Sequence, residues 1–173
     1  NAALMAAHFV KEMPENETPA TTEGYEGFYH ISDITACESE ATISMIIRDH
    51  DREKFENRKA FVEKLTSYMN SIYGEGTFTV QIKDSYYNMK EKIEPVQYVV
   101  DKAFDAMKNC GVTPKVKAIR GGTDGARLSF MGLPTPNIFA GGENFHGKFE
   151  YVPVSSMEKA VDVIVEISKL YTK

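Results

Sequence analysis

The sequence of 173 residues predicts two units of mixed helix and strand, an α+β sandwich over residues 1–88 and an α/β layer over residues 89–173. Two observations predict this division. Before residue 85, apolar and polar residues alternate in the strand-like runs, which is typical of strands with one solvated face. After it, helical patterns alternate with short apolar runs, which is typical of a parallel α/β layer.

The first unit contains helical and strand-like segments in the order α-β-β-α-β. Apolar residues at helical spacing cover residues 1–13, and Pro14 ends the pattern. A second helix is expected to begin after an N-cap at Asp51 and to end at Gly74. Strands are expected at residues 25–34, 41–49 and 77–84.

This order indicates a ferredoxin-like sandwich that lacks its first strand, because the complete fold runs β-α-β-β-α-β. The missing strand would leave a sheet edge unpaired, which proteins normally cover. The chain also begins with Asn1 inside a helical pattern, without Met or a charged leader. We therefore expect that the first strand precedes Asn1 in a longer protein.

The second unit is expected to alternate helices with two short strands. Pro95 and Gly111 bound the first helix, over residues 95–109, and Ser155 or Ser156 is expected to cap the last one. The remaining segments are a strand at 116–119, a short helix at 124–131 and a strand at 136–140. Two strands are too few for an independent parallel sheet, so this unit is expected to be the C-terminal part of a larger α/β domain into which the first unit is inserted.

Composition excludes several classes of function. The net charge is −5 and no basic stripe is present, which argues against binding to nucleic acid. No run of about 18 apolar residues occurs, so no membrane span is expected. Cys37 and Cys110 lack the spacing of a metal or redox motif and are expected to be free thiols of a cytoplasmic protein.

A candidate metal ligand lies in the polar, glycine-flanked loop of residues 141–152. His146 follows the expected strand at 136–140, and ligands bind in loops at the carboxyl ends of such strands. Imidazole is a common metal ligand, although a lone loop histidine can also be an ordinary surface residue. Glu143 and Glu150 are either partners that orient the ring or solvated carboxylates.

Two arginines are candidates for substrate binding. Arg120 begins a glycine-rich turn between a strand and a helix, where free N–H groups can hold an anion and the guanidinium suits a carboxylate. The alternative is a tight structural turn. Arg48 ends the second expected strand and forms either a surface salt bridge or a contact to a substrate.

Taken together, these motifs resemble the peptidase T family, which are tripeptide aminopeptidases of a zinc-dependent exopeptidase superfamily. The resemblance implies a two-zinc α/β catalytic domain with an inserted ferredoxin-like lid, which serves for dimerisation or for closing the site. The stretches that carry it are residues 1–7, 22–30, 46–49, 84–89, 120–126 and 141–151.

The resemblance also implies roles for individual residues. His146 corresponds to the zinc ligand from the C-terminal part of the catalytic domain. Arg48 and Arg120 correspond to groups that hold the peptide, and Asn88 to a residue that lines the cleft. The family's other His and Asp ligands, its bridging carboxylate and its general-base Glu have no match in residues 1–173, so no catalytic residue is expected here.

The leading hypothesis is therefore a C-terminal fragment of a cytoplasmic, zinc-dependent tripeptide aminopeptidase. The fragment is expected to be inactive alone, to supply at most one zinc ligand, and to form a homodimer through the lid. Two alternatives from other classes stay open: a non-catalytic module that binds an anionic ligand at the Arg120 turn, and a structural dimerisation module.

Overall fold

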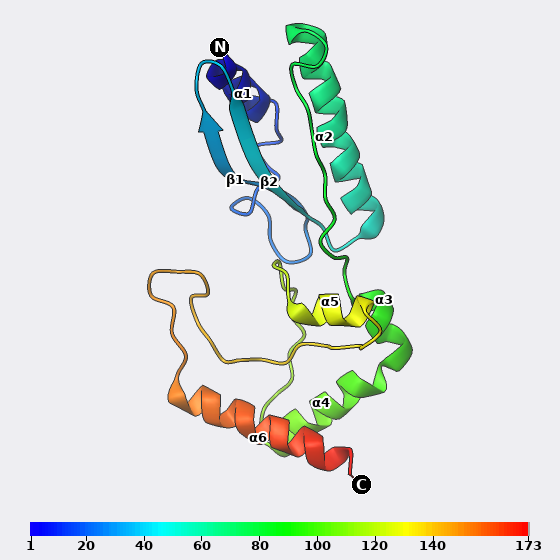
Figure 1. Ribbon diagram of the computed structural model, residues 1–173. Helices are drawn as coiled ribbons and strands as arrows, with labels where there is room; N and C mark the ends of the chain where they lie inside the picture. Colours follow the sequence, from blue (N-terminus) through cyan, green and yellow to red (C-terminus); the bar gives the residue numbers. More distant parts are fainter. Residues whose placement is uncertain (173) are drawn as a thin grey trace. The chain divides into compact units, whose positions relative to one another are not determined.

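The computed structural model describes residues 1–172 (Figure 1). They form two compact units. The first contains residues 1–88 together with residues 118–122, and the second contains residues 89–117 and the chain from Thr123 onward. No helix within residues 1–172 combines the length and apolarity needed to span a bilayer.

The first unit is built on an antiparallel hairpin, and α1 and α2 pack against its strands (Figure 1). The buried core contains apolar side chains from α1 and the turn that follows it, from β1 and from α2, namely Phe9, Met13, Tyr29, Val62, Leu65 and Met69. The elements are α1 (Ala2–Lys11), β1 (Phe28–Ala36), β2 (Ala41–Arg48) and α2 (Arg52–Tyr73).

Local signals set both ends of α2, as predicted. The Asp51 carboxylate accepts the Lys54 N–H at 2.9 Å, which satisfies one of the free donors of the first turn. Gly74 ends the helix with a φ of 108°, a backbone conformation that is unfavourable for residues other than glycine. The hairpin strands also lie close to their predicted positions.

The third strand predicted for this unit, at residues 77–84, is not formed. The sheet has two strands, and residues 77–84 pair with neither of them. The Asn70 side chain instead accepts the Phe78 N–H at 2.7 Å and donates to the Phe78 carbonyl at 2.9 Å. Alternating sequence makes a segment competent for a sheet, but a strand also needs a neighbouring backbone. No such neighbour lies beside this segment within residues 1–172.

In the second unit α4 and α6 pack together, with Ala106, Met107 and Val163 buried between them. The helix predicted at 95–109 is preceded by two short helical turns, and Pro95 lies in the second of them. The elements are α3 (Lys90–Ile93), the 3₁₀ helix η1 (Glu94–Val96), α4 (Tyr98–Asn109), α5 (Asp124–Phe130) and α6 (Val154–Leu170).

Three predictions for this unit are wrong within the described residues. Segments 116–119 and 136–140 form no strands, because no backbone there takes their hydrogen bonds. The N-cap of α6 is Pro153, not a serine. Its extended backbone presents a carbonyl that accepts the Ser156 N–H at 3.0 Å, so the proline backbone already starts the helix.

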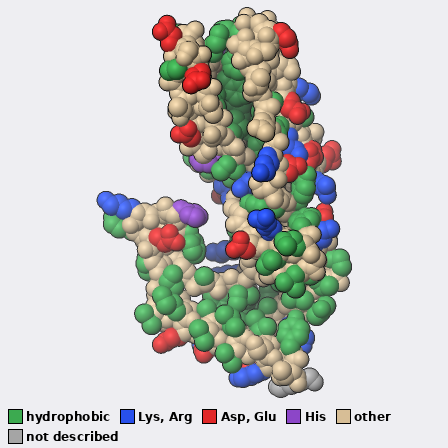
Figure 2. Space-filling model, viewed as in Figure 1, with side chains coloured by type: hydrophobic (Ala, Val, Ile, Leu, Met, Phe, Trp, Pro, Cys, Tyr) green, Lys and Arg blue, Asp and Glu red, His purple; other side chains and the backbone are tan. Residues whose placement is uncertain are grey.

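Helix α6 carries an exposed apolar stripe on a side other than that of buried Val163. Its members recur at the spacing of one helix face, and Figure 2 shows such exposed hydrophobic side chains over this unit. The stripe consists of Val154, Met157, Val161 and Ile164, each about half or more exposed.

A charged network ties the first loop to the hairpin and to α2. Arg58 donates to the Asp49 carboxylate at 2.9 Å and also contacts the Glu17 carboxylate. Only 2% of the Asp49 side chain is exposed. Burial lowers the pKa of Arg58, but the hydrogen bonds to Asp49 and Glu17 outweigh it and leave that pKa raised. Burial also raises the pKa of the neighbouring Tyr29 hydroxyl.

We predict that Asp49→Ala lowers the free energy of unfolding by about 2–3 kcal/mol, because it removes one partner of a buried charge pair. Equilibrium urea unfolding of the purified chain measures this change. Asp105→Ala is the matched control, since the Asp105–Lys108 pair is mostly exposed, and its effect should stay below about 0.5 kcal/mol. Equal effects of the two substitutions would contradict the prediction.

Candidate functional site

Three predicted site residues, Arg48, Asn88 and Arg120, lie in the first unit. Arg48 is the last residue of β2 and pairs with Phe28, the first residue of β1. Arg120 places its guanidinium over the Phe28 ring, 4.7 Å from the ring centre. The arginines therefore lie near the same end of the hairpin, although 72 positions (120 − 48) separate them in sequence.

The guanidinium of Arg120 is occupied by the protein itself. It donates to the Thr22 carbonyl at 2.5 Å and to the Pro19 carbonyl at 3.4 Å, and it also contacts the Thr22 hydroxyl. Its Nε atom is buried and has no hydrogen-bond partner among residues 1–172. This arrangement is a structural clamp on the loop before β1, so a ligand carboxylate would have to displace Thr22 to reach the same nitrogens.

Arg48 lies over the ring of Tyr86, 5.3 Å from its centre, and donates to the Ile47 carbonyl at 3.2 Å. The Tyr86 hydroxyl is buried and has no hydrogen-bond partner in the described part of the chain. It lies against Gly122, where an added Cβ would come within 2.0 Å of the hydroxyl oxygen. Glycine at this position of the turn is therefore required by the close approach of Tyr86.

Asn88 bonds to a residue that the sequence did not single out as a site residue. Its side-chain amide donates to the His50 carbonyl at 3.1 Å. The two ring nitrogens of His50 lie 3.2 Å from the Ile119 carbonyl oxygen and 3.3 Å from that of Tyr25. His50 thus contacts both the loop before β1 and the turn at 118–122, and the charged run Asp49–Asp51 was the only sequence signal for it.

His146 lies in the second unit, in an exposed loop whose base is closed by backbone bonds between Glu143 and Tyr151. Its backbone has a φ of 63°, and its N–H donates to the Glu150 carboxylate at 3.0 Å. Its ring makes no hydrogen bond or ion pair within residues 1–172. An exposed, unengaged imidazole is chemically suited to ligate a metal.

The described residues do not, however, assemble a metal site. Nowhere in residues 1–172 do three His, Cys, Asp or Glu side chains come together in a way that could hold an ion. A structural or catalytic zinc needs three or four protein ligands. His146 therefore fits one ligand position, and the other ligands would have to come from outside these residues.

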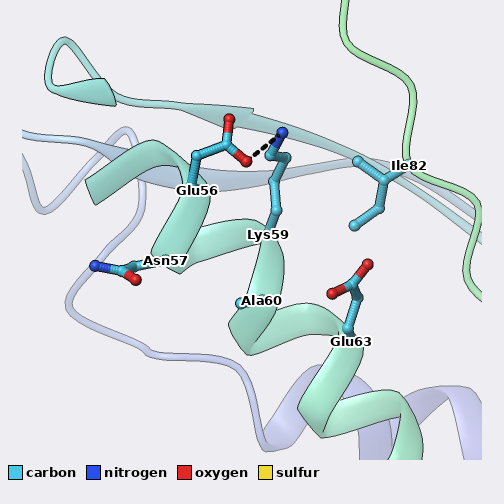
Figure 3. A pocket seen from close by; sticks show the side chains of 6 residues that line it. All are labelled: Glu56, Asn57, Lys59, Ala60, Glu63 and Ile82. Atoms are coloured by element: carbon cyan, nitrogen blue, oxygen red, sulfur yellow. Dashed lines mark ion pairs between the residues drawn. The ribbon is translucent and has the colours of Figure 1, made fainter. Parts of the chain in front are cut away.

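One groove of about 380 Å³ lies beside α2 in the first unit (Figure 3). Lys59 in it contacts Glu56 at 2.7 Å and Asp84 at 3.1 Å. The hydrogen bond to Glu56 raises the pKa of Lys59, and hydrogen bonds from Tyr87 and Lys59 lower the pKa of Asp84. None of the predicted site residues lines this groove. Its lining consists of Glu56, Asn57, Lys59, Ala60, Glu63 and Ile82.

Comparison with known proteins assigns the first unit to the class of peptidase dimerisation domains. Residues 1–77 match the family model of the peptidase dimerisation domain. The fold resembles that of a tripeptidase from Staphylococcus aureus, with a TM-score of 0.72 and 22% identity over 98% of this chain and 45% of that one. It also resembles aminopeptidase PepT from Bacillus cereus, with a TM-score of 0.63 and 20% identity over 99% of this chain and 45% of that one.

More particularly, the chain belongs to the peptidase T family, which confirms the resemblance seen in the sequence. It is 61% identical to peptidase T of Clostridium novyi over 161 residues, which is 93% of this chain and 40% of that protein. It is 57% identical to peptidase T of Bacillus licheniformis over 171 residues, which is 99% of this chain and 42% of that protein. The chain thus spans about two fifths of the length of these curated relatives.

We predict that Arg120→Ala lowers the free energy of unfolding by about 1–3 kcal/mol, because it leaves the acceptors of Thr22 without a charged donor. Arg120→Lys should restore little of this loss, since a single ammonium cannot reproduce the planar fork. Urea unfolding again provides the measurement, with Arg127→Ala on the exposed side of α5 as control. A stability of Arg120→Ala equal to that of the control would show that the clamp contributes nothing.

Proposed function

We propose that this chain is part of a zinc-dependent aminopeptidase that releases the N-terminal residue of tripeptides in the cytoplasm. The observation that carries the proposal is the 57–61% identity to peptidase T over nearly the whole chain. The fold similarity to a tripeptidase agrees with it. The two cysteines are free thiols, which is compatible with a reducing compartment.

In this proposal residues 1–88 form a ferredoxin-like lid through which the enzyme dimerises. The match of residues 1–77 to a peptidase dimerisation domain supports the dimer. The unpaired segment 77–84 and the edge of β2 away from β1 have no strand partner within residues 1–172. One additional strand from another part of the whole protein would satisfy the backbone hydrogen bonds of both. This is the strand that the ferredoxin-like order lacks.

Residues 89–173 would then form the C-terminal part of the catalytic α/β domain. The exposed stripe along α6 supports this assignment, because monomeric proteins seldom leave such a helix face uncovered. Segments 116–119 and 136–140 would become strands of the same domain once neighbouring backbones are present.

The proposed roles of the site residues follow the family resemblance. His146 would be one zinc ligand, and Arg48, Arg120 and Asn88 would contact the peptide substrate. When bound, zinc lowers the pKa of a coordinated water and polarises a carbonyl. The role of Arg120 requires that the substrate replace Thr22 as its acceptor. The alternative of a free-standing anion-binding module has less support, because the identity to peptidase T extends over nearly the whole chain.

We predict that the 173-residue chain alone does not hydrolyse tripeptides, because it offers His146 as a single candidate ligand and two zinc ions need several each. Tripeptide hydrolysis is assayed with and without added zinc, and with the whole enzyme as positive control. Turnover that copurifies with the 173-residue chain and disappears with a chelator would overturn the proposal.

In the whole enzyme, Arg120→Ala and His146→Ala should have different kinetic effects. Loss of a charged hydrogen bond to the substrate should raise KM about 10- to 100-fold. Loss of a metal ligand should instead collapse kcat and reduce the zinc content. Steady-state kinetics and metal analysis, on variants whose folding is checked by thermal unfolding, test both. Normal zinc content and a normal kcat in His146→Ala would contradict the proposed role of this residue as a metal ligand.

A further inference from the structure

The loop that carries His146 contains two residues other than glycine in the left-handed backbone region. Asn144 has a φ of 55° and His146 a φ of 63°. This region is disfavoured for residues with a Cβ, although asparagine and histidine enter it more often than most. Such a conformation persists where surrounding contacts hold it, and it is frequent at functional sites. The contact that holds His146 is therefore informative.

Glu150 provides that contact. Its carboxylate accepts the backbone N–H of His146 at 3.0 Å. Hydrogen bonds to an ionised acceptor are roughly twice as strong as neutral ones. The chain turns back within the same loop, since Gly147 donates to the Asn144 carbonyl at 2.8 Å and Glu150 to the Gly147 carbonyl at 3.2 Å. The carboxylate thus closes a small ring of contacts around the His146 backbone.

The second acidic residue of the loop makes no comparable contact. Within residues 1–172, Glu143 takes part through its backbone alone, in the pair with Tyr151 at 2.9 and 3.2 Å. Neither carboxylate bonds to the imidazole of His146 within the described residues. The structure therefore separates two glutamates that the sequence treats alike.

We propose that Glu150 is a positioning residue, which holds His146 in the left-handed conformation and so sets the direction in which its imidazole leaves the loop. The inference rests on the proposed role of His146 as a metal ligand. It differs from the usual support of a metal-bound histidine, in which a carboxylate bonds to the ring itself. Here the carboxylate acts on the backbone and leaves both ring nitrogens available.

The conformational part is tested on the 173-residue chain by NMR. In Glu150→Ala, the amide proton of His146 should lose its downfield shift, and the Cα and Cβ shifts of His146 should leave left-handed values. Glu150→Gln should keep part of both signatures, because its amide oxygen is still an acceptor. Glu143→Ala should change neither. Unchanged His146 shifts in Glu150→Ala would overturn the proposal.

The functional part is tested on the whole enzyme by zinc titration against a competing chelator, with the melting temperature as a check on folding. Glu150→Ala should bind zinc about 10- to 100-fold more weakly at an unchanged melting temperature. Glu150→Gln should lose less zinc affinity than Glu150→Ala. Glu143→Ala should bind zinc as tightly as the wild type. Altered His146 shifts with unchanged zinc affinity would overturn the positioning role. Normal zinc binding in His146→Ala would instead remove the proposed metal role itself, so the two failures are distinguishable.

Discussion

A β-strand is stable only where a neighbouring backbone takes its hydrogen bonds, and this constraint decides how much sheet residues 1–172 can form. The hairpin of β1 and β2 satisfies it within itself, since its strands are joined by a short turn. Residues 77–84, 116–119 and 136–140 have strand-like sequences but no such neighbour in the described part of the chain, so they remain unpaired there. Helices need no partner for their backbone bonds, and α2, α4 and α6 form with long, regular ladders.

The same need for satisfied polar groups explains the contacts of the turn at 118–122. Arg120 gives its donors to Pro19 and Thr22, and His50 approaches the Ile119 carbonyl. These contacts attach the turn to the first unit, although the chain on both sides of it belongs to the second. Arg120, one of the two arginines predicted to bind substrate, therefore makes structural contacts here, and a role in binding would require an exchange of acceptors.

The loop of His146 illustrates the opposite arrangement. Its backbone is held by Glu150 and by the Glu143–Tyr151 pair, while its ring is unengaged within the described residues. A backbone held by hydrogen bonds, with an available imidazole, is what the proposed role of His146 as a metal ligand requires. Membership of the peptidase T family rests on sequence identity, and the chain spans about two fifths of the length of its curated members.

The sequence by itself determined the features that depend on neighbours along the chain. Helical spacing and capping residues such as Asp51 and Gly74 act within one or two turns, and the hairpin forms between adjacent segments, so local pattern was sufficient to predict them. Family membership was also readable, because its motifs are short and specific. Only the tertiary structure decided the rest: that Thr22 occupies Arg120 from 98 positions away, that Glu150 binds the backbone of His146, and that three strand-like segments stay unpaired. Side-chain partners and strand neighbours depend on which surfaces meet in space, and local pattern does not carry that information.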